Sequence, residues 1–212
     1  VLYNLDEMTT DFPHALASLN SFKNKLDERN MPGRTTENWF AFGRSQSLKR
    51  FLAGEHLVCP VLSTSSNYVY DNDMVVFTGG GNGPFYGIEK KVTSQESIFY
   101  IQAILNHWLM ELLVKSRAST FRGDYYSHGK QFIAPLPIYK IDFENPTEVA
   151  RHQRIVEMVQ NIMQLKEQLA SAPNAARCTV LEHSITAINA ELNIAIDELY
   201  HCLLYTSPSP RD

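Results

Sequence analysis

The chain has 212 residues, of which 44% are hydrophobic and 20% charged, so it can form one large domain, or one domain with an appendage, around a real core. Its three cysteines, at positions 59, 178 and 202, have neither metal-ligand spacing nor the pattern of a disulfide framework, which suits a reducing cytoplasm. The longest apolar run, residues 98–114, is interrupted by polar residues and is not typical of a membrane span.

The net charge of −4 is distributed unevenly along the chain. Residues 1–141 carry 14 Lys and Arg against 13 Asp and Glu, whereas residues 142–201 carry 4 against 9. Within the first part, residues 23–50 hold seven basic and three acidic residues, and residues 115–130 hold four basic and one acidic. Two basic clusters on a mildly acidic chain favour a partner with a phosphate backbone over a membrane surface. The alternative is that the two basic clusters are ordinary solvated surfaces with no partner.

The first 51 residues predict two helical segments. Apolar side chains at three- and four-residue spacing predict a helix over residues 11–28, which Pro32 and Gly33 end. A second, shorter helix is expected over residues 44–51. It would place four polar side chains together: Arg44, Gln46, Lys49 and Arg50. Because Arg and Gln form paired hydrogen bonds with guanine and adenine edges, these four are candidate base-reading residues.

Residues 56–88 change to a strand pattern, with strands expected at 56–62, 68–70, 74–78 and 85–88. The turn after the first strand is rich in small polar residues and supplies further base-reading candidates: Ser63, Ser65 and Asn67. Between the last two strands lies a glycine-rich stretch without the G-x-G-x-x-G spacing of a dinucleotide site. We expect a flexible hairpin tip there. The alternative is a loop that approaches DNA closely through Gly80, Gly81, Asn82 and Gly83.

Residues 98–114 predict a core helix with a continuous apolar stripe, for which Ser94 is the expected N-cap. His107 and Trp108 on this helix are expected to be packing residues. The helix ends in basic residues and leads to the segment 121–138, which combines basic residues, aromatics, glycines and prolines.

Basic and aromatic side chains of this kind grip a phosphate backbone or stack on a base. The candidates for contacts with the DNA backbone are Lys115, Arg117, Arg122, Tyr125, Tyr126, Ser127 and Lys130. Pro135 and Pro137 predict that residues 132–138 leave the segment as an extended strand. The plain alternative is a surface loop with an aromatic anchor.

Beyond Pro146, two apolar stripes separated by residues 172–174 predict two amphipathic helices in an antiparallel hairpin. The expected fold class is α+β: a mixed sheet with flanking helices, followed by an antiparallel two-helix hairpin. We divide the chain into a recognition domain, residues 1–141, and a helical hairpin, residues 146–201. Residues 202–212 resemble the translated read-through of a sequencing adapter, so we expect them not to be native.

Several short motifs follow one another in an informative order. They are Trp39 with residues 43–46 (GRSQ), residues 60–63, 79–86 and 103–107, and, most specific, residues 121–126, 130–133 and 136–138. In this order they resemble the target-recognition (specificity) domain of type II adenine-specific DNA methyltransferases, above all the type IIG enzymes in which a restriction endonuclease is fused to the methyltransferase. The last motif is also similar to the end of the recognition domains of type I restriction specificity subunits. The resemblance covers about residues 11–196.

This resemblance implies that the region holds duplex DNA and reads its sequence, so that a methyltransferase domain upstream in the same chain can flip and methylate one adenine. S-adenosylmethionine would bind that upstream domain, whose Asn/Asp-Pro-Pro-Tyr/Phe motif and glycine-rich loop do not occur in this sequence. We therefore expect no catalytic residue, metal or cofactor in this chain, and no activity from it alone. The expected partners are double-stranded DNA, the methyltransferase domain and, through the hairpin, another domain or subunit. No membrane partner is expected, and the expected setting is a prokaryotic cytoplasm.

Three other functions are open. Asp73 and the run Glu89-Lys90-Lys91 loosely fit the D…E-x-K pattern of a Mg²⁺-dependent nuclease. A protein-interaction module would use the helical hairpin and leave the basic clusters without a role. A type I specificity subunit would read DNA in the same way, with the hairpin as a spacer to a second recognition domain.

Overall fold

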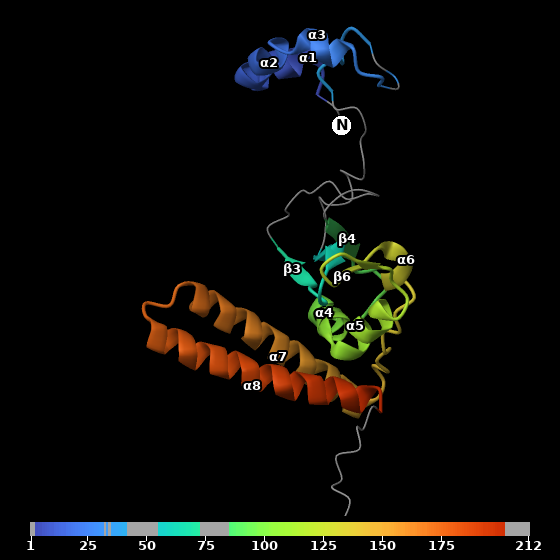
Figure 1. Ribbon diagram of the computed structural model, residues 1–212, viewed down its shortest axis with the longest axis vertical. Coiled ribbons are helices and arrows are strands. Elements are labelled where there is room, and N and C mark those ends of the chain that lie inside the picture. Colours follow the sequence, from blue (N-terminus) through green and yellow to red (C-terminus); the bar gives the residue numbers. More distant parts are fainter. Residues whose placement is uncertain (1–2, 32, 34, 42–54, 73–84, 202–212) are drawn as a thin grey trace, which may run out of the picture. The chain divides into compact units, whose positions relative to one another are not determined.

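The computed structural model describes residues 3–31, 33, 35–41, 55–72 and 85–201 (Figure 1). Contacts within the chain divide it into two compact units, Val1–Leu48 and Lys49–Asp212. Helices occur together with two small antiparallel sheets and a terminal helical hairpin, which confirms the expected α+β class. The functional division that we predicted at residues 141–146 stays a prediction.

The smaller unit contains three short helices, α1 Leu5–Asp11, α2 Pro13–Asn20 and α3 Lys23–Asp27. The helix expected over residues 11–28 is therefore present in two pieces, α2 and α3, and was wrong in being continuous. Phe12 has a non-helical backbone (φ −133°, ψ 49°), and Pro13 begins a new helix after it, since proline suits the first helical position. The unit has its own small core of Met8, Leu16 and Trp39. The helix expected over residues 44–51 lies outside the described residues.

Three strands of the larger unit form sheet A, in the order β3-β1-β4. They are β1 His56–Pro60, β3 Val69–Asp71 and β4 Phe85–Glu89, and both pairings are antiparallel. The strands expected at 68–70 and 85–88 are thus confirmed to within a residue, and the one expected at 74–78 lies outside the described residues. The strand expected at 56–62 ends at Pro60, because the chain then turns into a second sheet.

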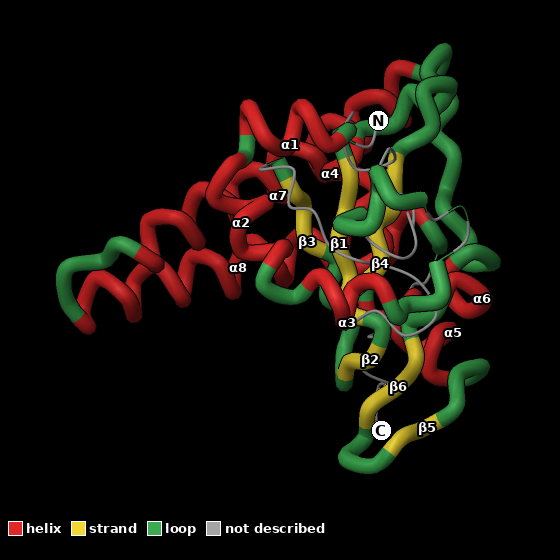
Figure 2. The backbone as a smooth tube through the Cα atoms, turned by 90° about the horizontal axis from the view of Figure 1, so that it is seen from above, coloured by secondary structure: helices red, strands yellow, loops and turns green. Residues whose placement is uncertain are grey.

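Sheet B has the order β2-β6-β5 and is also antiparallel. Its strands are β2 Leu62–Ser63, β5 Thr120–Phe121 and β6 Tyr125–Ser127. β5 and β6 form a hairpin that extends to one side of sheet A (Figure 2). Sheet B therefore joins two segments that are about sixty residues apart in the sequence, and both contain predicted DNA-contact residues.

The expected core helix is present, but it is divided in two by His107. α4 is Ile98–Asn106 and α5 is Trp108–Lys115. His107 has an extended backbone (ψ 144°), and its Nδ1 accepts a hydrogen bond from the N–H of Leu109 at 3.4 Å, so that its side chain caps α5. The break directs His107 and Trp108 towards α8: Asp197 lies 3.4 Å from His107 and accepts a hydrogen bond from Trp108 at 3.2 Å.

Ser97, and not Ser94, is the N-cap of α4. The hydroxyl of Ser97 accepts a hydrogen bond from the N–H of Phe99 at 3.2 Å. The hydroxyl of Ser94 instead donates to the carboxylate of Glu96 at 2.6 Å. Both serines are residues that suit a cap, but in the structure Ser97 caps α4 and Ser94 is bonded to Glu96.

The expected exit strand over residues 132–138 is also wrong. Residues 130–133 form a single helical turn, α6 Lys130–Ile133, which ends before Pro135. The residues after it have no regular structure, but Leu136 is buried in the core. The hydroxyl of Tyr200 holds this exit: it donates to the carbonyl of Pro137 at 2.6 Å and accepts from the N–H of Tyr139 at 3.0 Å.

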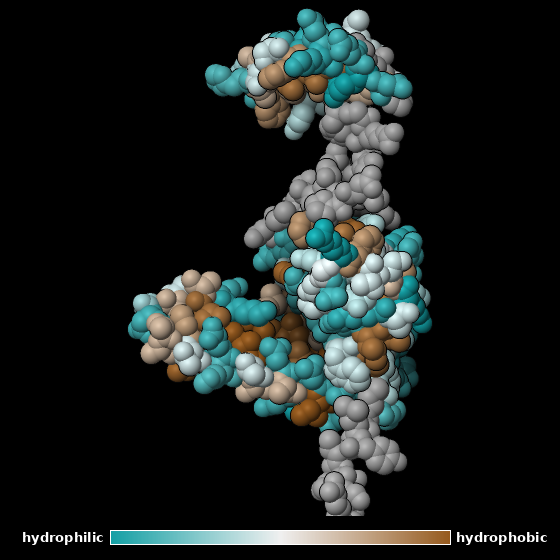
Figure 3. Space-filling view, viewed as in Figure 1, coloured by the Kyte–Doolittle hydropathy of each residue, from teal (hydrophilic) through white to brown (hydrophobic). Residues whose placement is uncertain are grey.

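The predicted antiparallel hairpin is confirmed. It consists of α7 Pro146–Ala170 and α8 Ala175–Leu199, which pack along each other, and the side chains of Asn145 and Asn174 cap their first turns. Figure 3 shows hydrophobic residues along the junction of the two helices. The end of the hairpin nearest the sheets packs against α4, while its loop end lies away from them (Figures 1 and 2). Each helix has 25 residues, but no helix in the described part of the chain is apolar enough to cross a membrane.

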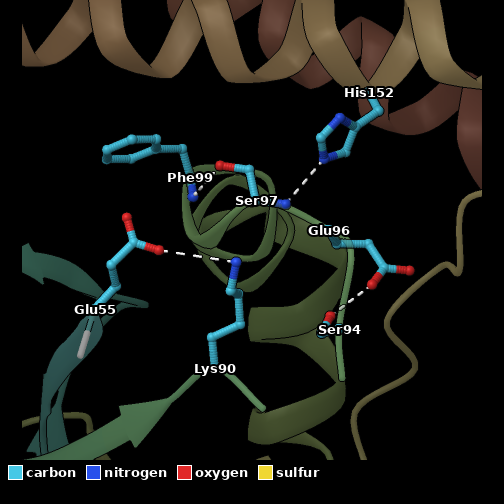
Figure 4. Close-up of polar contacts among 7 residues, drawn as sticks. All are labelled: Glu55, Lys90, Ser94, Glu96, Ser97, Phe99 and His152. Atoms are coloured by element: carbon cyan, nitrogen blue, oxygen red, sulfur yellow. Dashed lines mark hydrogen bonds and ion pairs between the residues drawn. The ribbon is translucent and has the colours of Figure 1, made fainter. Parts of the chain in front are cut away.

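One buried histidine connects the hairpin to α4. Nε2 of His152, on α7, accepts a hydrogen bond from the N–H of Ser97 at 3.0 Å (Figure 4). The imidazole also packs against the rings of Tyr100 and Phe143, with centroids 4.9 and 5.5 Å away. Burial lowers the pKa of His152 below its ordinary value, although the carboxylate of Glu96 acts in the opposite direction. The neutral ring is the form that can accept this hydrogen bond.

Candidate nucleic-acid interface

The turn between β5 and β6 holds Arg122 in an exposed position. Phe121 pairs with Tyr125 across the hairpin, so the turn consists of Arg122, Gly123 and Asp124, and all three are exposed. Gly123 and Asp124 have positive φ angles of 82° and 58°. Glycine adopts this left-handed backbone readily, and aspartate tolerates it better than most residues do. The turn therefore places a guanidinium in solvent at the end of a hairpin.

The inner face of sheet B packs against α5 through Tyr126. The ammonium of Lys115 lies 5.2 Å from the centroid of the Tyr126 ring, a cation–π contact. Ser63 and Thr120 are the cross-strand partners of Tyr126 and so share its face of the sheet. The structure thus brings together Lys115, Tyr126 and Ser63, which the sequence places far apart.

The charge of Lys115 is partly neutralised where it lies. Its ammonium forms an ion pair with the carboxylate of Glu111, one helical turn earlier on α5. The other oxygen of that carboxylate accepts a hydrogen bond from the N–H of Ser66 at 3.2 Å. A paired lysine attracts an anion less strongly than an unpaired one, because the partner's field opposes its own. We therefore expect Lys115 to contribute less to phosphate binding than Arg122.

The residues after Tyr126 have mainly local partners. The hydroxyl of Ser127 accepts a hydrogen bond from the N–H of Gly129 at 3.3 Å. His128 is buried, and its Nδ1 lies 3.1 Å from the carbonyl of Tyr126. Burial lowers the pKa of His128, which disfavours the charged form of the ring. Lys130 begins α6 and is exposed.

The other predicted residues are placed only in part. Arg117 is exposed just beyond α5, and Ser65 and Asn67 are exposed between β2 and β3, where the N–H of Ser65 donates to the hydroxyl of Ser63 at 3.3 Å. The remaining base-reading candidates and the glycine-rich loop lie outside the described residues: Arg44, Gln46, Lys49, Arg50, Gly80, Gly81, Asn82 and Gly83. The roles of all these residues stay predictions.

In the described part of the chain, no three His, Cys, Asp or Glu side chains lie close enough together to hold a metal ion. Of the residues that suggested a nuclease, Asp73 lies outside the described residues. Lys90 follows β4, and its ammonium lies 3.8 Å from the carboxylate of Glu55 (Figure 4). Glu55, the partner of Lys90 in this contact, is not part of the nuclease pattern.

Sequence reasoning did not name Leu62 or Phe121 as contact residues, although both lie on the same face of sheet B as Tyr125, the face opposite Tyr126. The alternation of side chains along a strand was the available signal, because it places Tyr125 and Tyr126 on opposite faces. The pairing of β2 with β6 has no signal in the sequence, and this pairing brings Leu62 to the same face.

Comparison with known proteins relates the chain to restriction–modification. No family model matches it. The type II restriction enzyme and methyltransferase RM.Eco57I of Escherichia coli is 29% identical to it over 167 residues, which cover 77% of this chain. The same residues cover 17% of the Escherichia coli protein, so the chain spans only a small part of that relative's length.

Proposed function

We propose that this chain is a target-recognition domain, which holds duplex DNA and reads its sequence for a DNA methyltransferase domain in the same polypeptide. The reaction would be methylation of a flipped adenine at N6, with S-adenosylmethionine bound in that other domain. The chain itself would perform no chemistry and would position the substrate.

The observation that carries this proposal is the exposed β5–β6 hairpin. It presents Arg122 in solvent, with Tyr125 beside it, within a stretch that has four basic residues and one acidic one. Arginine and tyrosine are common donors to DNA phosphates, and such contacts fix a protein on the duplex. The similarity to a restriction enzyme and methyltransferase supports the same assignment, because such an enzyme must recognise its DNA site.

The test is the salt dependence of duplex binding by the whole chain, measured by fluorescence anisotropy. Replacing Arg122 and Lys130 with alanine should weaken binding to all sequences alike. It should also flatten the plot of log affinity against log salt by about one unit for each lost phosphate contact.

Lys166→Ala is the matched control, because Lys166 is equally exposed but lies on the acidic hairpin. It should leave both the affinity and the slope unchanged. A slope that Arg122→Ala and Lys130→Ala do not alter would contradict the proposed interface.

A further inference from the structure

The outer face of sheet B is an exposed apolar surface. Phe121 pairs with Tyr125, Leu62 pairs with Ser127, and Tyr125 and Ser127 are two residues apart on β6, so all four side chains share one face. Of these, Leu62, Phe121 and Tyr125 are 44%, 48% and 45% exposed. Lys115 and α5 pack on the inner face of sheet B, whereas the rings of Phe121 and Tyr125 are exposed on the other face. We call Leu62, Phe121 and Tyr125 the outer face.

The ring of Tyr125 lies near the turn. A Cβ atom built on Gly123 would lie 3.5 Å from Cδ2 and 3.6 Å from Cε2 of that ring. Directly opposed residues on paired strands have Cβ atoms about 5 Å apart, which places Phe121 next to Tyr125. Phe121 and Tyr125 therefore offer exposed rings from paired positions of neighbouring strands, on which a flat ligand can stack.

We propose that the outer face stacks an unpaired DNA base, either one that has left the duplex or one that is exposed where the duplex is distorted. This inference rests on the proposed function and assigns it a second kind of contact. Aromatic side chains stack on any base because every base has a π-face, and basic side chains beside them hold the adjoining phosphates.

The charge around the outer face favours DNA over a protein segment as its occupant. Arg122 directly follows Phe121 and is exposed in the turn, and residues 117–130 carry three basic residues and one acidic residue. An apolar protein partner would need no such excess of positive charge. A DNA strand with one displaced base needs both features, because it brings a ring and two phosphates to the same place.

The experiment compares two short duplexes that differ only in one bulged 2-aminopurine, with the affinity measured by anisotropy and the stacking by 2-aminopurine fluorescence. The unaltered chain should bind the bulged duplex about 5- to 100-fold more tightly than the paired one, which is the usual contribution of one stacked base. The fluorescence should fall as the base stacks.

Substitutions test separately the contributions of the aromatic rings and of the Tyr125 hydroxyl. Phe121→Ala should lose most of the preference for the bulged duplex and leave the affinity for the paired duplex within about twofold. Tyr125→Ala should also lose the preference, whereas Tyr125→Phe, which keeps the ring, should retain it. Phe22→Ala removes an equally exposed ring (54%) from the smaller unit and should change nothing.

The outcomes distinguish this inference from the proposed function. Equal binding of both duplexes by the unaltered chain, together with a loss of binding in Arg122→Ala, would overturn the outer face as a stacking surface and leave the proposed function in place. Binding of neither duplex would overturn both. If Phe121→Ala changed the sedimentation of the chain but kept its preference for the bulged duplex, the outer face would be a contact between copies of this chain. That result would also overturn the proposal.

Discussion

Replacing His152 with alanine should lower the free energy of unfolding of the larger unit by about 2–4 kcal/mol. The imidazole accepts a hydrogen bond from the N–H of Ser97 at 3.0 Å, in the first turn of α4. Loss of an acceptor for a partly buried N–H costs about 1–3 kcal/mol. Removal of the ring from its contacts with Tyr100 and Phe143 adds a packing term of similar size.

Urea unfolding followed by helical circular dichroism measures this change, because α7 and α8, with 25 residues each, lie in the larger unit. His183→Ala is the matched control: this histidine lies on the exposed side of α8, and its replacement should cost less than about 0.5 kcal/mol. His152→Gln should recover part of the loss, since its amide oxygen can accept a hydrogen bond. If His152→Ala were as stable as His183→Ala, His152 would not connect the hairpin to α4.

Two further predictions concern charge. Glu111→Gln removes the carboxylate paired with Lys115 but keeps an oxygen for the N–H of Ser66. It should strengthen DNA binding and steepen the plot of log affinity against log salt by up to about 0.9, the value of one phosphate contact. Glu182→Gln, at an exposed position, is the control and should leave the slope unchanged. If Glu111→Gln also left the slope unchanged, Lys115 would be excluded as a phosphate ligand. Stability should also fall as the pH is lowered below about 6.5, where unfolded histidines take up protons. Burial lowers the pKa of His107, His128 and His152 in the folded chain. Between about pH 6.5 and these lowered pKa values, the unfolded state therefore binds more protons than the folded state. In that window the free energy of unfolding falls by up to about 1.4 kcal/mol per pH unit for each histidine. Urea unfolding at several pH values measures how the free energy of unfolding changes with pH. His152→Gln should reduce this pH dependence by the contribution of one histidine. If His152→Gln and the unaltered chain had the same pH dependence, His152 would not be held neutral in the folded chain.

The long helices were predictable because their signal is local and repeated. Apolar residues recur every three or four positions over 25 residues, and asparagine stands before each helix as a cap, so α7 and α8 follow from the sequence. β1, β3 and β4 are short but have apolar, β-branched or aromatic residues bounded by turns, and they were also found. The basic and aromatic character of residues 115–130 is likewise a property of the sequence, and the proposed DNA contacts rest on it.

The arrangement of the predicted contact residues depends on partners that are distant in the sequence. His107 interrupts an otherwise helical pattern and lies 3.4 Å from Asp197 on α8, a contact that no residue near it in the chain predicts. Residues 56–63 divide between two sheets because β2 pairs with β6, more than sixty residues away. The sequence by itself determined which side chains are available for DNA. Only the tertiary structure decided which face of sheet B each one occupies, because the side chains of a strand alternate and the pairing of its neighbours settles which ones are covered.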